Sequence, residues 1–240
     1  MVALVLLVGL ALLAATGYAI FMAPSSRVFG RYPHRGPSAE RVVALTFDDG
    51  PNEPYTGQIA DALQARGIRA TFFLVGRCVE RFPEAATRLV EAGHVIGNHS
   101  YTHRFHTYLL PGRFDREVAH TQTVLTDLLG RTPALVRTPW LWRTPGVLRS
   151  LRRQRLQPVA GVFAHAAEVF QPDAARLARR AIAKARPGAI LIFHDGFDGR
   201  GGDRAQTARA TELTVDALIR RGYRFVTVDE LLGVEAYRSG

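Results

Sequence analysis

Residues 41–51 read RVVALTFDDGP, and this stretch contains the clearest structural signal in the chain. The run of β-branched and large apolar residues over 41–47 predicts a buried β-strand. Two aspartates, a glycine and a proline follow it directly, and these residue types favour a turn. The stretch therefore predicts a strand that ends in two carboxylates, Asp48 and Asp49. A glycine-rich nucleotide loop of the G-x-G-x-x-G type is not present at this strand end.

Further apolar segments with strand character follow along the chain, with amphipathic segments between them. Strands are predicted at residues 69–76, 94–98, 133–137, 158–164, 189–194 and 223–228. Helices are predicted at residues 54–67, 82–93, 114–130, 172–188 and 205–222, several of which end in glycine. This alternation indicates a parallel sheet with crossover helices. An open doubly wound sheet and a closed barrel both fit it.

The amino-terminal stretch of residues 1–23 carries no charged side chain and is almost entirely apolar. At about 1.5 Å per residue, one helix of this length spans a hydrocarbon layer of about 30 Å. The length of the run and its missing basic leader favour an uncleaved anchor over a signal peptide, and small residues at 15–19 leave cleavage open. Residues 24–40 are rich in Pro, Gly, Ser and Arg, which predicts a linker or a lead-in along the domain edge.

The charge balance restricts the partners that we expect. The chain has 240 residues, 47% of them hydrophobic and 22% charged, as in a folded globular protein of one main domain. The net charge of +10 comes from arginine, because Lys184 is the only lysine. The arginines form no dense block and do not alternate with aromatic residues, so we expect no nucleic-acid partner. An anionic cell-wall polymer fits the charge. We prefer a monomer, although the oligomeric state is open.

Polar residues recur where the predicted strands end. In barrels and in open α/β sheets, the carboxyl ends of the strands are the edge at which sites are built. The residues at these ends are Asp48 and Asp49 after VVALTF, His99 and His103 after HVIGN, Arg137 after PALV, and His194 and Asp195 after AILIF. We therefore expect four separate segments to contribute to one site.

The aspartate pair and the histidine pair complement each other chemically. Of the two adjacent carboxylates, Asp48 and Asp49, one can bind a cation while the other accepts a proton from water. His99 and His103 are four residues apart, a spacing that suits ligation of zinc or a similar ion. A zincin-type protease would carry its glutamate base where Ser100 stands. The base must come from elsewhere, and the aspartate pair can provide it.

Two further residues have a structural and a functional interpretation. A lone histidine such as His194, at the end of an apolar strand, is usually a structural residue. If it faces a leaving amine it can act as a general acid, because its unperturbed pKa is about 6.5. Arg137, in VRTPW, is either a surface charge or the partner that holds the free aspartate by a charge-assisted hydrogen bond.

The ordered set TFDDG, H-S-x-x-H, R-x-P-W and IFHDG resembles that of the NodB-homology polysaccharide deacetylases, carbohydrate esterase family four. The resemblance covers about residues 41–235, which we take as the deacetylase domain. It implies a distorted (β/α) barrel of about seven parallel strands. It also implies a divalent metal, most often Zn²⁺, although Co²⁺ or another transition ion would fit.

The resemblance also implies which residues perform each task. It makes Asp49, His99 and His103 the metal ligands, and Asp48 the base that activates the water molecule.

Five further roles follow from the same resemblance. His194 protonates the departing amine, Arg137 orients the base, and the backbone N–H of Trp140 helps to stabilise the oxyanion. Ile192 matches an apolar position that lines the pocket for the acetyl methyl group. Glu168, in AHAAEVF, stands about where the family has the aspartate that pairs with the acid histidine.

The sequence departs from the family pattern at two places. Pro139-Trp140 is followed by Leu141, where family members usually have a glycine after an aromatic residue. A bulkier residue there is expected to narrow or reshape the groove. The Asp-Trp segment of the family is replaced by Glu168 without a tryptophan, so the partner of the acid histidine is the weakest part of the match.

The expected reaction is hydrolysis of N-acetyl groups in an N-acetylglucosamine polymer such as peptidoglycan or a chitin-like oligomer. Three alternatives stay open: deacetylation of an O-acetyl ester, hydrolysis of a small cyclic amide, and a weakly active cell-wall-binding protein. The expected substrate places the domain outside the cytoplasm, anchored or secreted. Arg27, Arg31 and Arg35 follow the apolar run, however, and the positive-inside rule would place the domain in the cytoplasm.

Overall fold

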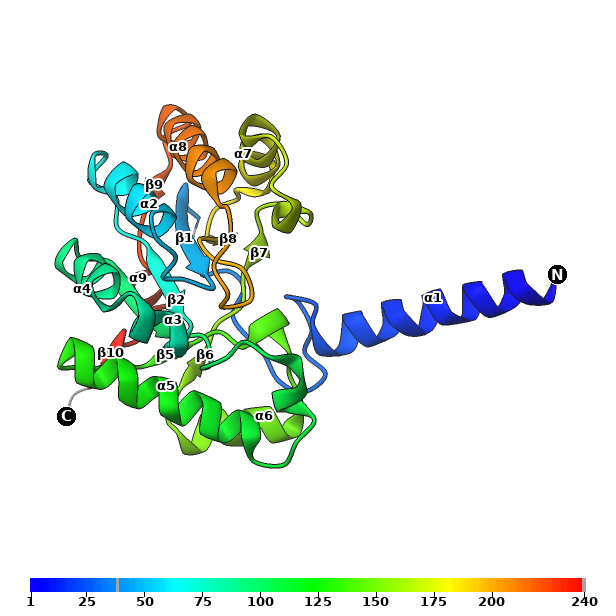
Figure 1. Cartoon of the computed structure of the whole chain (residues 1–240). Coiled ribbons are helices and arrows are strands. Elements are labelled where there is room, and N and C mark those ends of the chain that lie inside the picture. Colours follow the sequence, from blue (N-terminus) through cyan, green and yellow to red (C-terminus); the bar gives the residue numbers. More distant parts are fainter. Residues whose placement is uncertain (38, 239–240) are drawn as a thin grey trace.

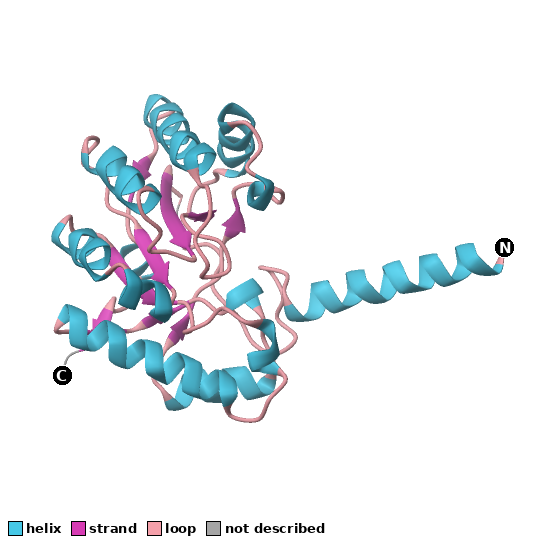
Figure 2. Ribbon diagram, viewed as in Figure 1, coloured by secondary structure: helices cyan, strands magenta, loops and turns pink. Residues whose placement is uncertain are grey.

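Strand β1 (Val42–Asp48) lies in the interior of the sheet. It pairs in parallel with β2 (Thr71–Leu74) on one side and with β8 (Ala189–His194) on the other. All of its residues are buried, as the apolar run at 41–47 predicts. The computed structural model describes residues 1–37 and 39–238, and its sheet is flanked by helices (Figures 1 and 2).

The main sheet is parallel throughout and has the strand order β6-β5-β3-β2-β1-β8-β7, with β9 beside the start of β1. A separate antiparallel pair is formed by β4 and β10. The remaining strands are β3 Val95–Asn98, β4 Thr132–Pro133, β5 Leu135–Val136, β6 Gln157–Pro158, β7 Val162–Phe163, β9 Arg224–Phe225 and β10 Tyr237–Arg238. This architecture confirms the predicted distorted (β/α) barrel of about seven parallel strands.

The two edges of the sheet come from one short segment of the chain. The prediction of a single strand over 158–164 was wrong, because β6 ends at Pro158 on one edge and β7 begins at Val162 on the opposite edge. Three residues join the two edges, so the sheet must curl towards closure. Gly161 permits this close approach, since a Cβ there would lie 2.7 Å from Cγ1 of Ile192.

The five predicted amphipathic segments form helices α2, α4, α5, α7 and α8. Helices α3, α6 and α9 were not predicted, and the start of α9 at Val228 shortens the strand expected at 223–228. The helices after α1 are α2 Tyr55–Gln64, α3 Gly76–Arg81, α4 Pro83–Glu91, α5 Arg113–Leu129, α6 Pro145–Arg153, α7 Ala174–Lys184, α8 Ala205–Arg220 and α9 Val228–Leu232. Short 3₁₀ turns are η1 Phe105–Tyr108, η2 Pro139–Leu141 and η3 Glu168–Phe170.

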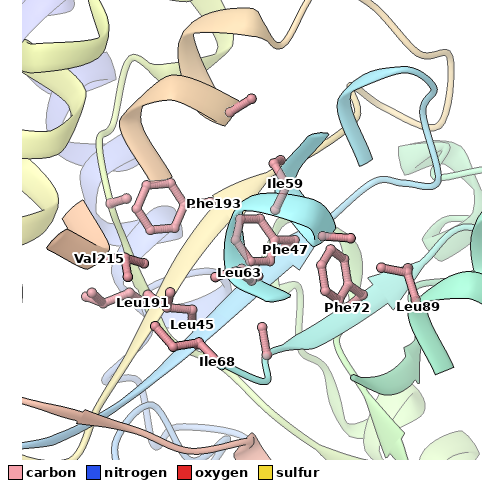
Figure 3. Close-up of a cluster of buried hydrophobic side chains, with 14 of the residues drawn as sticks. Leu45, Phe47, Ile59, Leu63, Ile68, Phe72, Leu89, Leu191, Phe193 and Val215 are labelled. Atoms are coloured by element: carbon pink, nitrogen blue, oxygen red, sulfur yellow. The ribbon is translucent and has the colours of Figure 1, made fainter. Parts of the chain in front are cut away.

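The largest apolar cluster lies between the sheet and the helices that cover one of its faces (Figure 3). Phe47 of β1 is at its centre and is fully buried. Its ring stacks on Phe72 of β2, with centroids 4.8 Å apart, and on Phe193 of β8, at 5.8 Å. These three rings join neighbouring strands, and two of these strands, β1 and β8, end in residues of the predicted site.

Replacing Phe47 by alanine is expected to lower the free energy of unfolding by about 3–5 kcal/mol, because a buried ring is lost and a cavity is left. Denaturant unfolding of the full chain in detergent measures the effect. The control is Ile219→Ala, at an exposed side chain on α8, for which a change within about 0.5 kcal/mol is expected. Similar losses in both variants would contradict this description of the core.

The segment predicted as a linker or lead-in, residues 24–40, contacts the domain. Tyr32 is fully buried in a second apolar cluster. The N–H of Gly36 donates a hydrogen bond of 2.8 Å to the carbonyl of Gly188, just before β8. Ser38 lies outside the described residues.

Helix α1 (Val2–Phe21) projects away from the domain (Figure 1). None of its residues is buried, and the mean hydropathy of its most apolar window is 2.4. It is long and apolar enough to cross a membrane, and a signal sequence would meet the same criteria.

Candidate active site

Four segments of the chain meet at the carboxyl ends of the parallel strands. The register pairs Asp48 of β1 with His194 of β8, and Asn98 of β3 with Val136 of β5. The polar residues that follow these strands therefore lie at one edge of the sheet. They border a cavity of about 450 Å³, a size typical of ligand pockets. The lining residues include Asp48, Asp49, His99, His103, Trp140, Glu168 and His194.

Asp49, His99 and His103 converge on one point. One donor atom of each lies within 4.8 Å of the others, and all three side chains are buried. Oδ1 of Asp49 is 3.3 Å from Nε2 of His99 and 3.1 Å from Nε2 of His103. The cluster thus offers two imidazole nitrogens and one carboxylate oxygen, a donor set that suits zinc and similar ions.

The far side of each imidazole faces an oxygen. Nδ1 of His99 donates a hydrogen bond of 2.7 Å to the backbone carbonyl of Arg137. Nδ1 of His103 lies 3.2 Å from Oδ1 of Asp198. Such partners fix the tautomer of a ligating histidine and orient its other nitrogen. Both Nε2 atoms face Oδ1 of Asp49.

The surroundings of Asp49 fit a cation. Among the described residues, no donor makes a hydrogen bond to its buried Oδ1, whereas Oδ2 accepts one of 3.0 Å from the N–H of Asp198. Burial opposes ionisation of Asp49, but His103 and His99 outweigh it and hold the pKa of this carboxyl well below its usual range. An ionised, buried carboxylate oxygen that faces Nε2 of both imidazoles is an environment that suits a metal ligand.

Asp48 is paired with a buried arginine. Nη1 of Arg137 lies 2.7 Å from Oδ1 of Asp48 and 2.7 Å from Oγ1 of Thr46. The guanidinium also donates to the carbonyl oxygen of Ala160 at 3.1 Å, and it is fully buried. The second carboxylate oxygen, Oδ2, lies 4.0 Å from Nε2 of His99. One oxygen of Asp48 is thus anchored, and the other lies beside the donor cluster.

His194 is paired with the glutamate that the sequence offered in place of an aspartate. Nδ1 of His194 lies 3.0 Å from Oε2 of Glu168, and its backbone N–H donates to Oε1 at 3.0 Å. The hydroxyl of Thr207 also donates to Oε1 at 3.0 Å. Burial disfavours the imidazolium, but Glu168 outweighs it and raises the pKa of His194 to about 9. The imidazole is therefore predominantly protonated at neutral pH.

Several residues at the site have positive φ angles that side chains with a Cβ rarely adopt. The angles are 78° at Asp49, 55° at His103, 54° at Trp140 and 57° at Leu141. Each such residue costs on the order of 1 kcal/mol or more, and such strain concentrates at functional sites. Trp140 and Leu141 both line the cavity. Leucine therefore occupies a backbone conformation that favours glycine, at the position where the family usually has one.

Ile192, predicted to line the acetyl pocket, is fully buried in the apolar cluster around Tyr32. It is not among the described residues that line the cavity. Its role in binding the acetyl group therefore stays a prediction.

Sequence reasoning did not single out Asp198, Tyr18 or Arg204, which also line the cavity. Asp198 and Arg204 lie in the loop 195–204, which directly follows β8. The sequence could have indicated them only as charged residues in a glycine-rich loop after a strand that ends at the candidate site. Tyr18 lies in the apolar amino-terminal stretch, and no pattern in the sequence connected that stretch with the site.

Comparison with known proteins identifies the family. Residues 35–159 match a family model described as polysaccharide deacetylase. The chain belongs to the polysaccharide deacetylase family. This confirms the resemblance to the NodB-homology enzymes that the ordered motifs indicated.

Relatives of this family are similar over most of their length. The chain is 30% identical over 197 residues to the peptidoglycan-N-acetylglucosamine deacetylase of Bacillus cereus, covering 82% of this chain and 90% of the relative. It is 32% identical over 193 residues to the chitooligosaccharide deacetylase of Rhizobium leguminosarum bv. trifolii, covering 78% and 89%. These relatives are named as deacetylases, which confirms the predicted class of enzyme, a hydrolase of carbon–nitrogen bonds.

The fold of the family agrees as well. A crystal structure of the Bc1960 peptidoglycan N-acetylglucosamine deacetylase, in complex with 4-naphthalen-1-yl-N-oxidanyl-benzamide, superposes with a TM-score of 0.79 at 28% identity. The match covers 86% of this chain and 95% of that structure. The similarity therefore extends well beyond the residues of the family model.

Proposed function

We propose that this polysaccharide deacetylase removes acetyl groups from N-acetylglucosamine-containing saccharides, such as peptidoglycan or chitin-like oligomers, in a metal-dependent hydrolysis. One observation carries the proposal. The donor cluster, Asp48 of the Asp48–Arg137 pair and both residues of the His194–Glu168 pair border the same cavity. Hydrolysis of an acetamide needs a base for water, an acid for nitrogen and a cation for the carbonyl oxygen, and each of these groups has its candidate there.

Asp49, His99 and His103 would hold the metal, with Zn²⁺ as the ion that this donor set suits best. When bound, the ion supplies Lewis-acid polarisation and lowers the pKa of water. Three protein donors leave positions open for water and for the substrate oxygen. Asp198, through Nδ1 of His103, and the Arg137 carbonyl, through Nδ1 of His99, orient the two imidazoles.

Asp48 acts as the general base. Arg137 holds its Oδ1, so Oδ2 is free to accept a proton from the attacking water. The water oxygen forms a bond to the acetyl carbon, and the backbone N–H of Trp140 stabilises the negative charge that develops on the carbonyl oxygen.

His194 acts as the general acid. The C–N bond breaks as the protonated imidazole gives its proton to the departing nitrogen, which leaves acetate and a free amine on the sugar. Glu168 keeps the ring oriented through Nδ1, so that Nε2 carries the transferable proton. About a quarter of the His194 side chain is exposed, which gives the proton access to the cavity.

The amino-terminal helix belongs to the same proposal. We take α1 as an uncleaved membrane anchor, since its last turn packs on the domain rather than ending in a free segment. Phe21 stacks on Trp142 with ring centroids 4.9 Å apart, and Ser26 donates a hydrogen bond of 2.7 Å to the Ile20 carbonyl. The enzyme would then act at a membrane surface.

The deciding experiment is acetate release by the full chain from N-acetylglucosamine oligomers and from peptidoglycan, in detergent and with added Zn²⁺. O-acetylated xylan is assayed alongside. Acetate from the amide substrates supports the proposal. Release from the ester alone would assign the site to ester deacetylation, and bound Zn²⁺ without release from any substrate would favour a wall-binding protein.

Replacing Glu168 by glutamine is expected to move the alkaline limb of kcat to lower pH by about 1–2 units. Glu168 raises the pKa of His194. The protonated imidazole, which is the acid form, is present below this pKa and is lost as the pH rises through it. Removing the negative charge lowers the pKa, so activity is lost earlier. The measurement is kcat between pH 6 and pH 10.

The control for this variant is Glu235→Gln, which removes an exposed carboxylate near the carboxyl terminus. Its pH profile is expected to match that of the unchanged chain. If Glu168→Gln has a measurable kcat and its alkaline limb does not move, the loss of activity at high pH does not come from deprotonation of His194. That result would contradict the assignment of His194 as the general acid.

A further inference from the structure

Helix α1 leaves the domain beside the candidate active site. Tyr18, near its carboxyl-terminal end, lines the same cavity as Asp49. The end of the helix is held in place, because the Phe21 ring stacks on Trp142 and the Phe21 carbonyl accepts a hydrogen bond of 3.0 Å from the N–H of Arg143. Packing therefore sets the position of the cavity relative to α1, with no flexible linker between them.

A bilayer crossed by α1 would lie against the face that bears the cavity. Figure 1 shows α1 extending away from the domain, with only its carboxyl-terminal end in contact with it. A helix of 20 residues is about 30 Å long, which matches the hydrocarbon layer and leaves no spare length. The cavity beside Tyr18 would then lie at the depth of the lipid headgroups, where tyrosine is frequent.

The loops around the cavity expose apolar side chains, which suits this depth. We call the loops after β3, β7 and β8 (residues 99–112, 164–173 and 195–204) the site rim. Apart from Met1 and α1, the large exposed apolar residues in the described part of the chain are Phe105, Leu109, Leu110, Val169, Phe170 and Phe197 on the site rim, with Val28 and Ile219 elsewhere. Such residues around a pocket indicate contact with a membrane or a partner, and the adjacent α1 favours the membrane.

Arg204 provides a second, independent observation. The residue is 2% exposed and lines the cavity. Its Nε and Nη1 atoms are buried and have no hydrogen-bond partner among the described residues. The guanidinium lies 5.2 Å from the ring centroid of Phe197, a contact that leaves these donors unsatisfied. Buried guanidinium donors without partners are costly, and their planar geometry matches an anionic group such as phosphate.

We infer that the substrate is an N-acetylated amino sugar joined through phosphate to a membrane lipid, with the sugar in the cavity and the phosphate on Arg204. This inference rests on the proposed function and specifies its substrate class. The acetamide of such a molecule lies near the headgroups, the depth at which α1 and the site rim hold the cavity. A lipid-linked sugar can be reached from either side of the membrane, so the inference is compatible with either orientation of the domain.

The test uses the full chain reconstituted in vesicles of phosphatidylethanolamine and phosphatidylglycerol. Three probes are compared: N-acetylglucosamine on a polyprenyl phosphate in the same vesicles, a neutral soluble N-acetylglucosamine oligomer, and a soluble oligosaccharide that contains the carboxylate of muramic acid. We expect kcat/KM for the lipid-linked probe to exceed that for the neutral oligomer by about tenfold or more, the effect of one charge-assisted contact.

The outcomes separate the inference from the proposed function. Deacetylation of the neutral oligomer with no preference for the lipid-linked probe overturns the inference and leaves the proposed function in place. A preference for the muramic-acid probe over the lipid-linked one assigns the Arg204 contact to a carboxylate and also overturns it. No acetate from any probe overturns the proposed function, and the inference with it.

Arg204→Gln tests the anion contact directly. We expect its KM for the lipid-linked probe to rise about tenfold, and more than its KM for the neutral oligomer, with Arg204→Lys restoring part of the difference. The control is Arg209→Gln, an exposed arginine on α8, whose ratio of the two KM values should equal that of the unchanged chain. Thermal unfolding shows that the variants fold. An unchanged ratio in folded Arg204→Gln would overturn the contact.

Discussion

Replacing Asp48 by asparagine is expected to lower kcat for acetate release by about 10³-fold or more while the variant still binds Zn²⁺. General-base catalysis typically contributes 10²–10⁴-fold, and asparagine cannot accept the proton. The amide keeps the shape of the carboxylate and can still accept a hydrogen bond from Arg137. Steady-state kinetics with an N-acetylglucosamine oligomer, together with the zinc content of the purified protein, measures both parts of the expectation.

Two controls accompany this variant. Asp48→Asn leaves the buried Arg137 without its counter-charge, so the fold must be verified by circular dichroism and thermal unfolding. Asp216→Asn also removes a carboxylate that pairs with an arginine, here Arg66, but on α8 and away from the cavity. The activity of this variant is expected to change less than about twofold. A folded, zinc-loaded Asp48→Asn protein with undiminished kcat would refute the assignment of the base.

The location of the candidate site could be predicted because it depends on one regularity. In a parallel sheet every strand ends at the same edge, so Asp48, His99, Arg137 and His194 had to lie close together once their segments were recognised as strands. The contact between Arg137 and Asp48 illustrates this, because 89 residues separate them in the chain and 2.7 Å separates their atoms.

Other features could not be read from local patterns. The closure of the sheet depends on Gly161, where one apolar run divides between opposite edges, and no period in the sequence marks the division. The loop 195–204 has neither helical nor strand periodicity, so Asp198 and Arg204 could not be placed from the sequence. Only packing shows that Asp198 contacts His103 and that Arg204 lines the cavity.

Glu168 shows how a departure from a motif can keep its geometry. Its side chain is one methylene longer than that of aspartate, and it reaches both Nδ1 and the backbone N–H of His194. Thr207 satisfies one of its oxygens from α8. The missing tryptophan therefore does not prevent the pairing. Because the His194–Glu168 and Asp48–Arg137 pairs are both formed, the site favours an enzyme over a weakly active cell-wall-binding protein.

Removal of the metal is expected to lower acetate release by about 10³-fold or more and to lower the thermal unfolding temperature. A ligand present at 100 times its dissociation constant stabilises the folded state by about 2.7 kcal/mol, and this stabilisation is lost with the ion. Dialysis of the full chain against a chelator, followed by titration with Zn²⁺ or Co²⁺, tests the expectation. Activity and unfolding temperature should recover together at about one ion per chain.

The three proposed metal ligands can be distinguished from neighbouring residues by the same titration. Asp49→Asn removes the ionised oxygen on which both imidazoles converge, and we expect at least about a 100-fold loss of zinc affinity in calorimetry. Asp198→Asn keeps all three donors but weakens the orientation of His103, so a loss of about 10–100-fold is expected. Affinity should also fall as the pH falls, because protons compete for the imidazole nitrogens. Unchanged zinc affinity in Asp49→Asn would place the metal elsewhere and would remove the basis for the hydrolytic mechanism.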